Sequence, residues 1–228
     1  MSATDATAVE ALTTPAKDED EEAMPSSSSP PVSAKSLSGE KAQRIIDAMR
    51  RSVARRGTAG STFDHVSREA GVSRGLLHYY FGTKEQLLVK AVRRDCELRL
   101  ELLERRLSTA RSADDFIDLM AENLQETLRE DPDFVTLVFE LFTLSRRNVE
   151  IADEYAGLMR RTRERVAGML AAAQEAGILH LHADPEAVAE ILFSLGDGLA
   201  LRMLSEPERN FTPTIRAGIA SVRALLTD

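Results

Sequence analysis

One short predicted helix, residues 74–81, carries side chains suited to hydrogen bonding on one face and apolar side chains on the other. At about 100° per residue, four positions share the outer face: Arg74, Gly75, His78 and Tyr79. The inner face holds Leu76, Leu77, Tyr80 and Phe81. An Arg side chain matches the acceptors on a guanine edge, and a Gly lets the backbone approach a partner closely. This face is therefore typical of a helix that reads base edges in a DNA groove.

Capping residues next to this helix suit contact with phosphates. Ser73 is expected to cap the helix and leave its first amides free to meet a phosphate. Thr62 is a plausible cap for the preceding helix and a second phosphate contact, and Thr83 with Gln86 forms a capping-box pattern. Lys84 stands in a first helical turn, where the helix dipole disfavours a cation. It either adds to a phosphate site or is an ordinary solvated lysine, and its neighbours favour the phosphate.

The pattern of residues 61–88 predicts a short helix, a turn at Gly71, a second short helix, and a third helix that begins at Thr83. This is the layout of a helix-turn-helix, in which the second helix enters the major groove. The charge agrees: residues 39–90 hold ten basic and five acidic residues, although the whole chain has a net charge of −8. Double-stranded DNA is therefore the predicted partner.

The motif resembles the TetR family of repressors over roughly residues 39–90. The residues that carry the resemblance are Thr62, Val66, Ala70, Gly71, Val72, Ser73, Gly75, Leu77, Tyr79, Tyr80, Phe81, Lys84, Leu87 and Leu88. The resemblance implies a homodimer with a variable C-terminal ligand domain that leaves DNA when a ligand binds. Three residues depart from the family pattern, Asp64, Leu76 and His78, and these put the operator sequence in doubt.

The fold class predicted for the whole chain is all-α, with about nine helices and no strand-like alternation. Residues 1–37 read as a disordered, acidic, Ser/Pro-rich tail, 38–86 as the helix-turn-helix DNA-binding domain, and 87–228 as a helical ligand-binding and dimerisation domain. The first helix is expected to stop at Gly57. The acidic start is unlike a signal peptide, no apolar run predicts a membrane span, and the single Cys96 suits a reducing compartment. A cytoplasmic location is expected.

The predicted eighth helix is apolar on nearly every side between residues 187 and 204, so it needs two packing partners. One partner is its own domain. The other is expected to be the ninth helix together with a second subunit, because Ala217, Ala220 and Ala224 would allow close helix approach. A homodimer through the last two helices is the prediction, and a monomer that buries the eighth helix is the alternative.

A pocket for an unknown, largely apolar small-molecule effector is the second C-terminal prediction. The candidate lining residues are Phe116, Met120, Phe139, Phe142, Met159 and Phe193. Each of them has ordinary core packing as its alternative role. Glu190, Ser194 and Asp197 lie on one line of the eighth helix, where they either face solvent or orient a polar or cationic ligand end.

Signals for enzymatic chemistry are poor: there is no Gly-rich phosphate loop and no GxSxG motif. His180 and His182 flank one residue, but such a pair without a nearby cysteine is weak evidence for a metal site. No catalytic residue, metal or cofactor is predicted. The sequence favours a ligand-responsive transcriptional regulator, with a constitutive DNA-binding regulator as the alternative.

Overall fold

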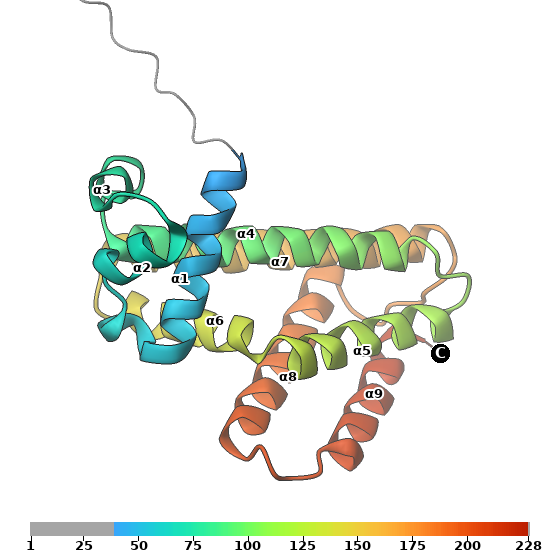
Figure 1. The fold of residues 1–228 in the computed structure, drawn as a ribbon. Coiled ribbons are helices and arrows are strands. Elements are labelled where there is room, and N and C mark those ends of the chain that lie inside the picture. Colours follow the sequence, from blue (N-terminus) through green and yellow to red (C-terminus); the bar gives the residue numbers. More distant parts are fainter. Residues whose placement is uncertain (1–38, 228) are drawn as a thin grey trace, which may run out of the picture. The chain divides into compact units, whose positions relative to one another are not determined.

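The computed structural model describes residues 39–227, and helices make up all of the regular structure in that range. The predicted tail, residues 1–37, lies outside the described residues. The helices in chain order are α1 (Gly39–Gly60), α2 (Phe63–Ala70), α3 (Arg74–Phe81), α4 (Lys84–Leu107), α5 (Ala113–Glu130), α6 (Pro132–Ser145), α7 (Val149–Glu175), α8 (Pro185–Ser205) and α9 (Thr212–Leu226). The all-α prediction is confirmed, and residues 39–227 form nine helices, the number that the sequence led us to expect (Figure 1).

Helix starts are fixed by side chains that accept hydrogen bonds from otherwise unpaired backbone amides. Ser112 Oγ accepts from the Asp115 amide at 3.1 Å, at the start of α5. Asp131 Oδ1 accepts from the Phe134 amide at 3.2 Å, so this residue caps α6.

Gly57 interrupts α1 with φ +67° and ψ 175°, a backbone conformation that glycine adopts most readily. The expected stop at Gly57 is therefore a break, after which a further turn reaches Gly60. That extra turn leads directly into α2, so the break sets the angle between the long part of α1 and the helix-turn-helix.

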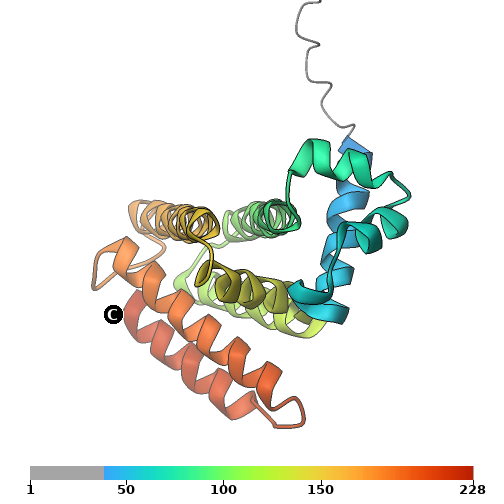
Figure 2. The same cartoon turned by 90° about the vertical axis from the view of Figure 1, so that its left-hand side faces the viewer.

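α4 and α7 lie side by side, and α5 packs against α4 (Figures 1 and 2). α8 packs on α7, and α8 and α9 form an antiparallel pair at the C-terminal end (Figure 2). The short helices α2 and α3 pack against α1 and the first turns of α4. The helix-turn-helix thus lies beside α1 and the N-terminal end of α4, well away from the α8–α9 pair (Figure 1).

Two apolar clusters form the core, and α4 contributes to both. Near the helix-turn-helix, Leu88 and Val92 of α4 pack with residues of α1, α2, α3, α6 and α7. Farther along, Leu103 and Leu107 pack with residues of α5, α7, α8 and α9. The sequence boundary expected near residue 86 falls in the first turn of α4, and the helix continues without a break into the second cluster. No helix among residues 39–227 is long and apolar enough to cross a membrane.

Candidate nucleic-acid interface

The turn between α2 and α3 is built by caps at both ends. Thr62 Oγ1 accepts from the His65 amide at 3.4 Å and starts α2. Gly71, with φ +66°, ends α2, and the Val72 amide donates to the Ser67 carbonyl at 2.9 Å. Ser73 Oγ then accepts from the Leu76 amide at 3.2 Å and starts α3. The predicted caps at positions 62 and 73 are confirmed, and they set the crossing of the two helices.

The inner face of α3 anchors it to the body. Leu77 is fully buried, and Leu76 and Phe81 are packed partly buried against the same cluster. Burying one leucine side chain contributes about 1.5–3 kcal/mol, enough to hold an eight-residue helix that would not be stable alone.

The outer face of α3 is open to solvent, as the helical phasing predicted. Arg74, Gly75, His78 and Tyr79 are all exposed, and the Tyr79 ring is 72% exposed. A Cβ atom built on Gly75 would meet nothing within 4 Å, so a partner can approach the backbone there. Solvent alone gives no reason to leave a large aromatic ring uncovered. This face has the shape and chemistry of a contact surface.

Asp64 of α2 reaches into this face, where sequence reasoning treated it only as a departure from the family. Its Oδ1 lies 3.3 Å from Arg74 Nη1, and both side chains are exposed. On the other side Arg74 Nε donates to His78 Nε2 at 3.4 Å. The three residues therefore form one array, and the only sequence signal for it was the polar character of positions 64, 74 and 78.

Lys84 lies in the first turn of α4, behind the predicted Thr83 cap, whose Oγ1 accepts from the Gln86 amide at 3.1 Å. Its ammonium donates to the Thr58 carbonyl at 2.7 Å and lies 3.9 Å from a Glu85 oxygen. Lys84 thus binds the last turn of α1, just beyond the break at Gly57. The side chain is therefore not simply solvated, and its contact with a phosphate stays a prediction.

The same segment is held from a second side by α6. Glu140 Oε2 accepts from the Thr58 hydroxyl at 2.7 Å and from the Thr58 amide at 3.2 Å. All three polar groups of Thr58 are therefore bound by residues of α4 and α6. These contacts join the helix-turn-helix to the C-terminal helices just beyond the break at Gly57.

A charged network links α1, α4 and the start of α6 a few turns away. Arg50 of α1 lies 2.7 Å from Asp95 of α4 and 2.5 Å from Asp131, the α6 cap. Arg99 of α4 also pairs with Asp131 at 2.5 Å. Burial raises the pKa of Asp95 to about 6, against the opposing attraction of Arg50 and Arg99. In the sequence, the only sign of this network is Asp95, an acidic residue on a helix face that also carries Val92 and Cys96.

Of the six residues predicted to line a ligand pocket, four belong to or pack against the two apolar clusters, and Phe139 and Phe142 belong to neither. Phe116 is buried in the second cluster, where Met120 and Phe193 are partly buried, and Met159 packs against the first cluster. Phe139 is half-buried, while Phe142 is 45% exposed and its ring lies 5.8 Å from that of Tyr155. The six residues therefore do not form one cluster, and their role as a pocket lining stays a prediction.

On the line formed by Glu190, Ser194 and Asp197, the three polar side chains have different surroundings. Glu190 pairs with Arg163 of α7 at 3.4 Å, and the Ser194 hydroxyl donates to the Glu190 carbonyl. Burial, followed by repulsion from Glu190, raises the pKa of Asp197. Tyr155 has a raised pKa as well, caused first by burial and then by the Asp197 carboxylate. The Asp197 side chain is exposed on α8, and its carboxylate is near enough to Tyr155 of α7 to influence that pKa.

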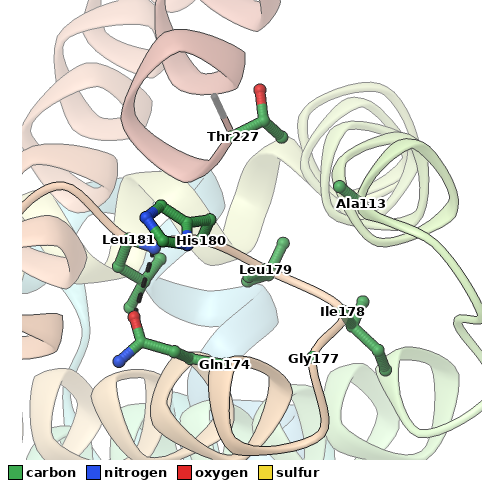
Figure 3. A pocket seen from close by; sticks show the side chains of 8 residues that line it. All are labelled: Ala113, Gln174, Gly177, Ile178, Leu179, His180, Leu181 and Thr227. Atoms are coloured by element: carbon green, nitrogen blue, oxygen red, sulfur yellow. Dashed lines mark hydrogen bonds between the residues drawn. The ribbon is translucent and has the colours of Figure 1, made fainter.

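Two cavities of similar size lie at the surface, and none of the six predicted residues borders either one. The first, about 510 Å³, lies where α7 ends, and Leu179, His180 and Thr227 are among its lining residues (Figure 3). The Leu181 amide donates to Gln174 Oε1 at its edge (Figure 3). The second, about 530 Å³, is lined by charged residues of α7 and by Gln86 of α4.

Comparison with known families matches both halves of the chain. Residues 45–91 match the family described as "Bacterial regulatory proteins, tetR family". Residues 113–226, half of the chain, match "BetI-type transcriptional repressor, C-terminal".

Individual relatives agree with these family matches. The HTH-type transcriptional regulator PksA of Bacillus subtilis (strain 168) is 28% identical over 172 residues, covering 73% of this chain and 80% of that protein. The HTH-type transcriptional regulator BetI of Rhizobium meliloti (strain 1021) is 28% identical over 161 residues, covering 69% and 75%.

The same fold occurs in a transcriptional regulator of Saccharomonospora viridis crystallised in complex with choline. The TM-score is 0.67 and the sequence identity 24%, over 83% of this chain and 99% of that one. The α2–α3 unit, its open polar face and the family matches all indicate a regulator that binds DNA. The chain is a DNA-binding transcriptional regulator of the TetR family, with a C-terminal domain of the BetI type.

Proposed function

We propose that this regulator is a repressor that binds a pseudo-palindromic operator as a homodimer and is released by a small molecule. The proposal of a dimer rests on the outer face of α8. Ile191, Leu195 and Leu201 are 46%, 42% and 52% exposed on it. Three large apolar side chains exposed along one helix are typical of an interaction site.

α9 supports the same partner. Ala217, Ala220 and Ala224 are exposed along the side of α9 that faces away from its buried residues. Methyl side chains let a second helix come close, and a twofold axis would pair this surface with itself. Each subunit would then present one α3, so two half-sites about one helical turn apart, or slightly more, form the operator.

The dimer is tested by Leu195→Glu, which places a charge in the proposed interface. We expect monomers in sedimentation experiments and a loss of cooperative operator binding. Thr143→Glu adds the same charge at an exposed site of α6 and serves as the control. Dimers that persist in the Leu195 variant would contradict the proposed interface.

For the effector, we propose a small cation with apolar arms that binds beside Asp197. Burial, followed by repulsion from Glu190, raises the pKa of Asp197, and a bound cation would offset that repulsion. The Tyr155–Phe142 pair supplies aromatic faces, which attract cations by about 0.5–2 kcal/mol. The choline complex of the Saccharomonospora viridis regulator supports this ligand class. The proposal adds a charge to the largely apolar effector expected from the sequence.

Choline is the first probe, titrated into the protein by calorimetry. Binding should weaken at least tenfold in Asp197→Asn but only slightly in Glu190→Gln, which removes an equal charge on the same helix face. Equal affinity in wild type and Asp197→Asn would contradict the proposed site.

Release would follow from differential affinity for two arrangements of α3. Reciprocity requires that operator DNA, selected from a random duplex pool, weaken effector binding by the factor with which effector weakens DNA binding. Equal effector affinity with and without DNA would favour the constitutive alternative. One observation supports that alternative: Phe116 and Leu170 are almost fully buried, so the C-terminal core is filled around them. We propose a cytoplasmic location for the protein, whether its DNA binding is ligand-responsive or constitutive.

A further inference from the structure

Three polar side chains and one carbonyl form a continuous array across the open face of α2 and α3. Asp64 Oδ1 lies 3.3 Å from Arg74 Nη1, and Arg74 Nε lies 3.4 Å from His78 Nε2. His78 Nδ1 in turn lies 3.2 Å from the Gly82 carbonyl oxygen, at the end of α3. The array joins an acid of one helix to the backbone end of the next through the arginine between them.

The partners of the ring nitrogens fix where the protons lie. A carbonyl oxygen can only accept, so His78 Nδ1 carries the hydrogen and donates to Gly82. Nε2 of this neutral ring has a lone pair, which accepts from Arg74 Nε–H. The Phe63 ring meets the imidazole edge-on with centroids 4.7 Å apart, so the ring is also held by packing. His78 is therefore a fixed acceptor for Arg74.

Counting the guanidinium hydrogens shows what remains for a partner. Arg74 has five N–H groups, of which Nε–H points to His78 and one Nη1–H to Asp64. Three hydrogens remain, on Nη1 and Nη2, at the outer end of a side chain that is 60% exposed. A parallel pair of such hydrogens matches O6 and N7 of guanine, the commonest specific contact in the major groove.

Asp64 is unfavourable for binding the DNA backbone, because its carboxylate repels phosphates from the face where Arg74 should attract them. A role in orientation explains its position. A guanidinium held at two of its edges loses less rotamer entropy when it meets a base than a free arginine does.

We infer that Asp64 and His78 are positioning residues that hold Arg74 for a guanine and so determine specificity at one base position of the recognition site. The inference deepens the DNA-binding role and rests on it. It also changes the assignment of His78, which the sequence placed among the base-contacting residues.

The test is selection of bound sequences from a random duplex pool with the full-length protein, comparing base preferences position by position. Wild type should enrich guanine at one position, and Arg74→Ala should lower that preference by about 5- to 150-fold, the range for one base-edge contact. Asp64→Ala should lower it about 3- to 10-fold at the same position and have no further effect when combined with Arg74→Ala.

Glu69→Ala is the matched control. It removes one carboxylate from the same helix, but Glu69 pairs with Arg51 of α1 at 2.5 Å. Both variants should strengthen binding to random DNA similarly, because each removes a charge that repels phosphates. Only the Asp64 variant should change a base preference. Melting curves confirm that both variants fold.

His78→Ala should act at the Arg74 position too. A change at a different position would make His78 a direct reader and overturn its assignment. Identical preferences for the Asp64 and Glu69 variants would overturn the role of Asp64 while leaving DNA binding intact. If wild type enriched no sequence at all, the DNA-binding role would fail and the inference with it.

Discussion

Replacing Asp95 by Asn should make the protein's stability less dependent on pH. The Asp95 side chain is 8% exposed, and burial raises its pKa from 3.8 to about 6, although Arg50 lies 2.7 Å away. The folded protein therefore holds this proton more tightly than the unfolded chain does. The stabilisation is fully present below about pH 4 and is lost as the pH rises through about 6. A pKa difference of about two pH units corresponds to about 3 kcal/mol.

The assay is urea unfolding followed by circular dichroism, for wild type and Asp95→Asn, at several pH values between about 4 and 7. Other carboxylates titrate in the same range, but their effects cancel when the two proteins are subtracted. Relative to the variant, wild type should lose up to about 3 kcal/mol as the pH rises. Asp133→Asn, at an exposed site on α6, should show no such trend.

A wild-type advantage that grows with pH would refute this reasoning. It would mean that attraction by Arg50 and Arg99 outweighs burial, so that the carboxylate is held as an anion. A flat difference would place the folded pKa of Asp95 near its unfolded value.

Three further predictions concern single side chains. Lys84→Ala should reduce the slope of log affinity against log salt by about one if the ammonium leaves Thr58 for a phosphate in the complex, and an unchanged slope would mean that it stays. Glu140→Gln removes the negative charge of the carboxylate that accepts two hydrogen bonds from Thr58. The free energy of unfolding should therefore fall by about 1 kcal/mol in thermal or urea melts. No change would show that the turn at Thr58 does not need the carboxylate. Burial raises the pKa of Cys96 to about 12, so thiol reagents at about pH 8 should label it only after unfolding, and rapid labelling of native protein would contradict this.

Local signals were sufficient to predict the helices. Asp184 and Ser73 are followed by helices in the structure because a side-chain oxygen at a cap satisfies amides only a few residues away. The outer face of α3 was predictable for a similar reason, since 100° per residue separates Leu77 from Tyr79 without any knowledge of the fold.

The contacts that join the helix-turn-helix to the other helices could not be predicted in this way. Thr58 and Glu140 are 82 residues apart, and Arg50 and Asp131 are 81 apart. Each of these charges, taken in sequence, is as compatible with a solvated surface as with a pair. Only the packing of α1 against α6 brings the partners together.

The proposed ligand site was harder to predict than the helices, because aromatic residues in a sequence do not show whether their side chains point into the core or into solvent. Phe116 and Phe142 are the same residue type on neighbouring helices, yet one is buried and the other is 45% exposed. The sequence signal for the proposed effector site is the acid at position 197 within an apolar helix. Its surroundings depend on Tyr155, a residue of α7 that sequence reasoning did not select.

The unbroken length of α4 has a consequence for the sensitivity of the regulator. Its 24 residues make a rod about 36 Å long, because each residue of an α-helix rises about 1.5 Å. A tilt of about 5° around the end near Leu107 would move the end near Lys84 by about 3 Å. Hydrogen bonds to base edges tolerate only a few tenths of an ångström, so a rotation that barely disturbs packing at one end is enough to separate α3 from a groove at the other. An effector of this protein would therefore need only a small structural change to act over the full length of the rod.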